Sequence, residues 1–301
     1  MSTRHIWAIT MSALVVVAVT VAGCGKASNV LDPNDAGNAG PAARLGAAPD
    51  ARQSQDDEAT GHGKGQDAQP ITGPAIIDSP GNYRLTDDFT VTQGDGIVIR
   101  ASHVRLWLGE HRLSGPGNKL GRAIAIEGAQ DVHVVGGRIE TFGIGAALLD
   151  ASRCRLAHLD IRGGDEPADP AAGNPPQIGI MLINSAMNEL TANEMSGINL
   201  GVFVRGGGSY GNRIAENEAL GGQHGLLGIC YNPAPGGDPA GPHGDRVARN
   251  LLARFGTGIA TSSHSAENVF RMNTIRYFTS AYVDQNGTNV FANNRTIQIT
   301  P

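Results

Sequence analysis

Residues 94–118 read GDGIVIRASHVRLWLGEHRLSGPGN, and this stretch decides the fold. It holds three short alternating runs, at 97–99, 104–108 and 111–113, each interrupted by Gly, Ser, Asn or Pro. Short runs with a period of two between turn residues predict strands rather than helices. The same order of features returns along the rest of the chain, so the sequence predicts a repetitive β architecture.

The repeat has a period in the low twenties. Small or apolar residues open successive units with a basal spacing of 21–24 residues, at Gly96, Ala123, Ala146, Ile180, Gly201, Gly225, Gly258 and Ala281. Strand-like runs with such a period predict a solenoid, in which each unit packs on its neighbours. Segment 71–92 lacks a full unit and is expected to cap the N-terminal end. Two Pro/Gly-rich surpluses, 164–176 and 232–244, are expected to leave from different corners as loops.

Polar pairs five residues apart mark the later units. They are Asn188 with Asn193, Asn212 with Asn217, Asp245 with Asn250, Asn268 with Asn273, and Asn289 with Asn294. A weaker form stands earlier, at Asp131 with Gly136 and at Cys154 with Leu159. Asn tolerates a left-handed backbone, and its amide both donates and accepts hydrogen bonds. Stacked on the next coil, such residues are expected to form ladders along the axis.

Three short strands per unit with Asn or Gly corners predict an all-β, single-stranded parallel β-helix of about nine coils over residues 70–301. The segments 80–85 (PGNYRL) and 94–99 (GDGIVI), with the Asn spacing, resemble the right-handed parallel β-helix superfamily of pectate-lyase type. Within it they are most similar to the repeat proteins grouped with the periplasmic copper-accessory protein of nitrous oxide reductase. The resemblance implies the right-handed fold. It implies no single activity, because that superfamily contains lyases, hydrolases, epimerases, adhesins and scaffolds.

The N-terminus is predicted to direct the chain to the cell envelope. An apolar run from Trp7 to Ala22 is too short to span a bilayer and is typical of a signal peptide, here residues 1–23. It ends in Val-Ala-Gly-Cys, which resembles the lipobox of bacterial lipoproteins and implies lipid attachment at Cys24. Gly25, rather than Asp, favours the outer membrane. An ordinary secretory signal with an incidental cysteine is the alternative. Polar residues 24–69 are expected to form a disordered tether.

Composition and charge exclude some classes of function. The net charge is −5 and the pI about 6.0, so no overall basic field favours nucleic acid. No tight His-x-His, Cys-x-x-Cys or Asp-x-Asp-x-Asp spacing is present, so no metal site or cofactor is expected. Cys154 and Cys230 lie about three coils apart, too far for a disulfide, and are expected to be buried. Met181, Met187, Met195 and Met272 are expected in the core.

Candidate site residues follow from the repeat. The residue that closes the first strand of successive units is polar, which predicts an outer-edge ladder of Arg100, Glu127, Asp150, Asn184 and Arg205. Its two carboxylates are candidates for an acid/base pair, and its other members for binding a sugar acid. A solvated row of ion pairs is the alternative. A second candidate cluster consists of His224, which abuts a first strand, and of Asp238, His243 and Asp245, which lie in or beside the loop 232–244.

These expectations describe a lipid-anchored protein of the cell envelope that binds a polysaccharide or an envelope partner along an outer face of the β-helix. The alternative is a carbohydrate-active enzyme, a lyase, hydrolase or epimerase, that acts on an acidic polysaccharide. In the enzyme alternative Glu127 and Asp150, or the region of His243 and Asp245, carry the chemistry.

Overall fold

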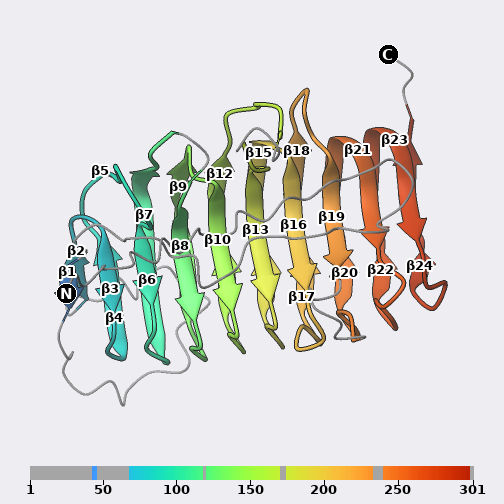
Figure 1. The fold of residues 1–301 in the computed structure, drawn as a ribbon. Helices are drawn as coiled ribbons and strands as arrows, with labels where there is room; N and C mark the ends of the chain where they lie inside the picture. The colour runs from blue at the N-terminus through green and yellow to red at the C-terminus, as the bar shows by residue number, and fades with distance from the viewer. Residues whose placement is uncertain (1–42, 46–67, 118–119, 170–173, 233–239, 299–301) are drawn as a thin grey trace, which may run out of the picture.

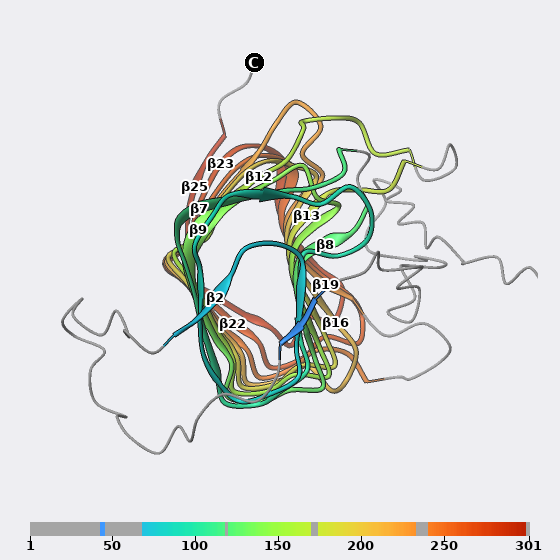
Figure 2. The ribbon, with the colours of Figure 1, turned by 90° about the vertical axis from the view of Figure 1, so that its left-hand side faces the viewer.

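The computed structural model describes residues 43–45, 68–117, 120–169, 174–232 and 240–298. These residues form strands and no helix, and every pair of named strands is parallel. The strands stack along one axis (Figure 1). Seen from the N-terminal end, the chain turns clockwise as it recedes from the viewer (Figure 2). The fold is therefore the predicted right-handed parallel β-helix. The predicted signal peptide, Cys24 and nearly all of the predicted tether lie outside the described residues.

Each coil contributes strands to three faces. Face A contains β3 (Ala75–Ile77), β6 (Ile97–Ile99), β8 (Arg122–Glu127), β10 (Ile144–Leu149), β13 (Ile178–Ile183), β16 (Leu200–Arg205), β19 (Leu227–Asn232) and the second parts of β21 (Leu251–Thr261) and β23 (Thr274–Asp284).

Face B contains β4 (Gly81–Leu85), the first parts of β7 (Val104–Ser114) and β9 (His133–Glu140), β11 (Arg155–Ala157), β14 (Glu189–Thr191), β17 (Arg213–Ala215), β20 (Arg246–Ala248), β22 (Val269–Arg271) and β24 (Val290–Ala292). Face C contains β5 (Phe89–Thr90), the ends of β7 and β9, β12 (Asp160–Arg162), β15 (Glu194–Ile198), β18 (Glu218–Gly221), the first parts of β21 and β23, and β25 (Arg295–Ile297).

The N-terminal end differs from expectation. Segment 71–92 is a coil in its own right, because it supplies β3, β4 and β5 to the three faces. Two further strands precede it. β1 (Ala43–Leu45), inside the predicted tether, pairs with β3, and β2 (Gln69–Ile71) pairs with β4. Each of these strands is only three residues long, too short to show a period of two, and for this reason the sequence did not reveal them.

The core is a continuous column of apolar side chains from all three faces. On face A the stacked inward residues include Ile97, Ile124, Ala146, Ile180 and Val202, each fully buried or nearly so. A second apolar cluster lies on the outer side of the same strands, at the alternate positions. Its members include Ala147, Leu149, Met181, Ile183 and Phe203. Face A is thus apolar on both sides, as is common for strands of parallel sheets.

A column of the smallest residues runs along face A, one position before the inward column. Its members are Gly96, Ala123, Gly145, Gly179, Gly201, Gly228, Gly258 and Ala281. A Cβ atom on Gly201 would lie 2.3 Å from the carbonyl oxygen of Gly228. The predicted unit openings agree with this column at five positions. They are one residue late at Ala146 and Ile180 and three residues early at Gly225.

The predicted Asn ladders are confirmed. The Asn188 backbone N–H and side-chain amide donate to the Asn212 Oδ1 atom over 3.0 and 3.1 Å, and Asn193 donates to Asn217 in the same way. The pattern continues to Asn289 on the corner between faces A and B and to Asn294 on the corner between B and C. In the earlier coils the equivalent positions hold Val132 and Gly137 in one coil and Cys154 and Leu159 in the next. The predicted positions Asp131 and Gly136 are therefore one residue too early.

The column of the smallest residues on face A leads to a prediction about stability. Gly201→Ala is expected to lower the free energy of unfolding by about 1–3 kcal/mol, because the new methyl group overlaps the Gly228 carbonyl unless the coils separate. Urea unfolding followed by circular dichroism measures the change. Gly73→Ala is the matched control, because a Cβ there has no neighbour within 4 Å. Equal stability of the two variants would contradict the tight stacking.

Candidate functional site

The predicted outer-edge ladder divides into two columns. Strand register places Glu127 beside Leu149, which is followed by Ile183 and Arg205. Asp150 and Asn184 lie one residue further, at the left-handed corner after the strand, with φ angles of 50° and 47°. The Asp150 backbone N–H donates to the Ile183 carbonyl. The prediction that all five residues stack on one another is therefore wrong, and Glu127 and Asp150 do not share a column.

Glu127 takes part in an ion-pair network at the N-terminal part of face A. Its carboxylate accepts hydrogen bonds from Arg100 over 3.0 Å and from Arg122 over 2.9 Å. On the other side, the Asp95 carboxylate accepts hydrogen bonds from the backbone N–H and the guanidinium of Arg122. Burial alone would lower the pKa of Arg122, and the two carboxylates raise it above its ordinary value. Glu127 is engaged in structure, as the alternative of a row of ion pairs predicts.

The other predicted ladder members differ in accessibility. Asp150 and Asn184 are exposed, whereas Arg205 is only 4% exposed. Burial lowers the pKa of Arg205 to about 10. Leu149 and Ile183 of the outer apolar cluster lie in the same column as Arg205. A continuous polar edge along face A is therefore absent from the described residues.

His243 and Asp245 are close in sequence but have different surroundings. Asp245 is fully buried and replaces Asn in the ladder on the corner between faces A and B, called the first ladder below. Its Oδ1 atom accepts a hydrogen bond from the Asn212 backbone N–H over 2.7 Å. Its own backbone N–H donates to the Asn268 Oδ1 atom over 3.0 Å. Where an Asn would donate a second N–H, Asp presents Oδ2, an acceptor unless it is protonated. Burial raises the pKa of Asp245 to about 6, and the hydrogen bonds from Asn212 lower it only in part.

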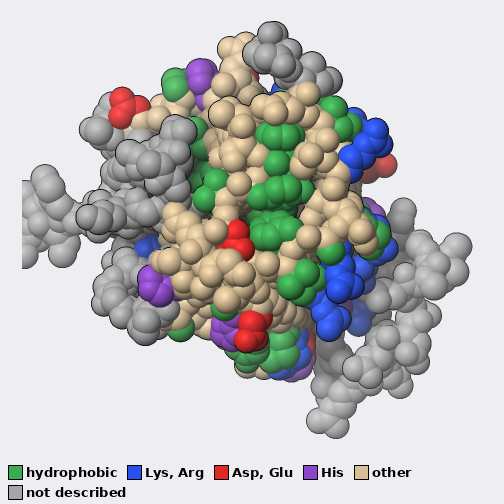
Figure 3. All heavy atoms as spheres, turned by 90° about the vertical axis from the view of Figure 1, so that its right-hand side faces the viewer, with side chains coloured by type: hydrophobic (Ala, Val, Ile, Leu, Met, Phe, Trp, Pro, Cys, Tyr) green, Lys and Arg blue, Asp and Glu red, His purple; other side chains and the backbone are tan. Residues whose placement is uncertain are grey.

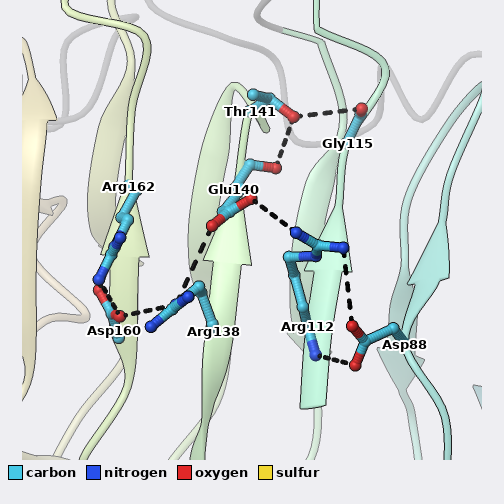
Figure 4. A network of polar contacts seen from close by, with 8 residues as sticks. All are labelled: Asp88, Arg112, Gly115, Arg138, Glu140, Thr141, Asp160 and Arg162. Atoms are coloured by element: carbon cyan, nitrogen blue, oxygen red, sulfur yellow. Dashed lines mark hydrogen bonds and ion pairs between the residues drawn. The ribbon is translucent and has the colours of Figure 1, made fainter. Parts of the chain in front are cut away.

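Face C carries a balanced charge network (Figure 4). Arg138 donates to Asp160 over 3.0 Å, Arg162 donates to the same carboxylate over 2.9 and 3.0 Å, and Asp88 accepts from the Arg112 backbone N–H over 2.9 Å. Glu140 lies 3.9 Å from Arg112 and 4.0 Å from Arg138. The three guanidinium groups are about half exposed and are matched by three carboxylates. Pairing of this kind leaves little charge for an anionic ligand.

Face B carries an unbalanced column of charge, which the sequence analysis did not identify. Strand register stacks Arg105, His133, Arg155, Glu189, Arg213 and Arg246 along the outer side of six successive coils. These side chains point outward, because the residues that follow them, from Leu106 to Val247, are buried in the core. Basic side chains gather on this flank of the molecule, at the right in Figure 3.

The carboxylate of Glu189 contacts two members of the column. It lies 3.9 Å from the Arg155 guanidinium and forms a close ion pair with Arg213. Within the part of the chain that the structure describes, Arg105 and Arg246 form no ion pair. Flanking charges neutralise one another, since Arg153 pairs with Asp131 over 2.9 Å. The column thus contains four arginines and one carboxylate, and its formal charge is positive.

Other candidate groups provide no site. Among the described residues no group of His, Cys, Asp or Glu has the geometry of a metal centre. Cys154 and Cys230 are buried and not joined by a disulfide. Burial raises the pKa of Cys154 to about 11, which suppresses its reactivity. Met187 and Met272 are 50% and 49% exposed, so their assignment to the core was wrong. The described residues contain no helix long and apolar enough to cross a bilayer.

Comparisons with known proteins add little to this picture. No family model matches the chain, and no curated protein is similar in sequence. Among solved structures, alginate lyase from Paenibacillus sp. str. FPU-7 has 12% identity and a TM-score of 0.47, over 76% of this chain and 92% of the lyase. The periplasmic alginate epimerase AlgG has 10% identity and a TM-score of 0.41, over 76% and 70%. The Dettilon tailspike protein has 12% identity and a TM-score of 0.37, over 76% and 60%. At these values the fold assignment rests on the strand pairing itself.

Asp245, the acidic member of the first ladder, leads to a prediction of how stability depends on pH. The pKa of Asp245 is about 6 in the folded chain and ~3.9 when unfolded, so the folded state holds the proton more tightly. The contribution of Asp245 to stability is therefore fully present below about pH 4 and falls by about 3 kcal/mol as the pH rises through about 6. Asp245→Asn restores the regular rung and is expected to remove this loss. Urea unfolding at a series of pH values measures it.

Asp150→Asn is the control, because Asp150 is exposed at a corner. This control is expected to keep the pH dependence of the original chain. If Asp245→Asn also kept it, Asp245 would not be the group responsible.

Proposed function

We propose that the protein is a lipid-anchored component of the cell envelope that binds an acidic polysaccharide along face B. The observation that carries this proposal is the column of Arg105, His133, Arg155, Arg213 and Arg246 with a single carboxylate among them. Guanidinium groups bind carboxylates in bidentate geometry, so a row of them suits a polymer of uronic acids.

The arrangement suits a linear polymer better than a small ligand. Successive coils are about 4.8 Å apart, and the column from Arg105 to Arg246 spans five such steps, about 24 Å. Several sugar units of one chain can therefore contact it at once. Each exposed contact is weak, so affinity would depend on many contacts and would fall as salt is added.

Other features of the proposal rest on the sequence. The lipobox-like segment supports attachment at Cys24 and an outer-membrane location. Kinship with the copper-accessory-type β-helix group is proposed at the level of architecture only. The enzyme alternative has no specific observation in its favour, because Glu127 is engaged with Arg100 and Arg122.

A charge-removal experiment tests the binding surface. One variant replaces four arginines of the column by Gln, at Arg105, Arg155, Arg213 and Arg246. It is expected to bind polygalacturonate at least about tenfold more weakly, a loss of ~1.4 kcal/mol in binding free energy. The matched control replaces Arg112, Arg138 and Arg162 of face C by Gln, since their charges are already balanced. Affinity is measured by titration calorimetry at two salt concentrations, with dextran as an uncharged polymer.

Three outcomes would overturn the proposal. They are equal affinity for dextran, equal loss of affinity in the face C control, and tighter binding of double-stranded DNA than of any polyuronate. The last would assign the column to nucleic acid, which the net charge of −5 disfavours.

The proposed anchor has its own test. Cys24→Ala removes the sulfur that would carry the lipid, and the protein is expected to move from the membrane fraction to the soluble fraction of its host. Ultracentrifugation followed by immunoblotting measures this. Retention of the variant in membranes would contradict lipid attachment at Cys24.

A further inference from the structure

Two adjacent coils share a four-residue pattern at the corner between faces A and B, namely an aromatic ring, Gly, Asn or Asp, and Arg. The first reads Tyr210-Gly211-Asn212-Arg213, and the second reads His243-Gly244-Asp245-Arg246. Strand register superimposes them, because Tyr210 bridges to His243 and Arg213 pairs with Arg246. In both, an aromatic ring and an arginine flank a buried rung of the first ladder. The equivalent segments of the neighbouring coils, 186–189 and 266–269, lack the ring, the glycine and the arginine.

The two rings form an accessible platform. Their centroids are 5.5 Å apart and their planes differ by 17°, so they are stacked. Tyr210 is 40% exposed although it is a large aromatic residue. Along the axis the column continues with Ala186 on one side and Ala266 on the other, and both of these side chains are small. The His243 Nδ1 atom lies 3.2 Å from the Gly241 carbonyl oxygen, which fixes the orientation of its ring.

The two glycines leave open space between the rings and the arginines. A Cβ atom on Gly244 would have no neighbour within 4 Å, and one on Gly211 would meet only the Met187 Cγ atom at 3.7 Å. Both have left-handed φ angles of 65° and 66°. Most other coils hold side chains at this position with similar φ angles, namely His103, Asp131, Arg153, Met187 and Glu267. Left-handed φ therefore does not require glycine here, and its effect is a gap two coils wide.

We propose that this gap is a subsite for one uronic acid unit of the polymer. The apolar C–H face of the sugar ring would pack on the Tyr210 and His243 rings. Its carboxylate would pair with Arg213 or Arg246, which border the other side of the gap. The proposal rests on the proposed binding of an acidic polysaccharide along face B and locates its strongest contact, because among the described coils only these two place a glycine between an aromatic ring and an arginine at this corner.

The test separates the subsite from the column. The double variant Tyr210→Ala with His243→Ala is expected to bind a short oligogalacturonate about tenfold more weakly than the original chain, with unfolding in urea little changed. Tyr277→Ala is the matched control, because Tyr277 is 48% exposed but lies on face C. A second variant, Gly244→Asn, fills the gap without removing a contact and is expected to weaken binding by a similar factor, since Asn accepts a left-handed backbone.

The outcomes are distinguishable. If the original chain binds no polyuronate, the proposed function itself fails. If it binds, and the arginine variants weaken binding while the ring variants and Gly244→Asn do not, the column stands and the subsite is wrong. Weaker binding in the Tyr277→Ala control would also overturn the subsite, because the effect would then be unspecific.

Discussion

Stacking of each coil on the next at the spacing of hydrogen-bonded parallel strands constrains every other feature of this molecule. A coil can stack only if its corners repeat the backbone shape of the coil below. The two ladders that end at Asn289 and Asn294 meet this requirement, since each side-chain oxygen accepts the backbone N–H of the preceding rung. The column that includes Gly201 and Gly228 meets it on face A, where a Cβ atom on Gly201 or Gly228 would lie 2.3 or 2.5 Å from a carbonyl oxygen of the next coil. Both devices tie the sequence to the axial spacing.

Regular stacking also determines how surface charge is distributed. Residues more than twenty positions apart in sequence become neighbours about 4.8 Å apart, so each outer column sums the charges of its members. On face C the members include both signs and form local pairs such as Arg138 with Asp160. On face B, one column holds Arg105, Arg155, Arg213 and Arg246 with Glu189 alone among them. A chain with an overall negative charge thus presents one positive stripe.

The sequence predicted the structure correctly where it specified the register, that is, which residues of neighbouring coils lie side by side. The Asn pairs gave the ladders correctly, because two polar residues at a fixed separation admit one alignment. Small residues were ambiguous wherever two are adjacent, as at Gly145 and Ala146. A slip of one residue turns a side chain to the other side of a strand. This slip grouped Glu127 with Asp150, although Leu149 is its true neighbour.

The positive column was missed for the same reason. Its arginines are distant in sequence, and their common feature is that three of them follow a ladder position, as Arg213 follows Asn212 and Arg246 follows Asp245. Alignment of the units on the ladder residue, rather than on the small opening residue, would have exposed it. The burial of Asp245 and its effect on the pKa needed the three-dimensional environment, because the sequence shows only an Asp where Asn is usual.

The position of the two-coil gap has an energetic consequence. Its ring and its arginine flank a ladder residue that is hydrogen-bonded to the coils on both sides, as Asn212 is to Asp245 on one side and to Ser185 on the other. Binding groups that are already ordered lose little conformational freedom when a ligand arrives. An exposed arginine on a long loop would lose more. On a surface of weak contacts, binding groups therefore contribute most to affinity where they lie beside a ladder. The corner between faces A and B is the place where the ring, the gap and the arginine lie together.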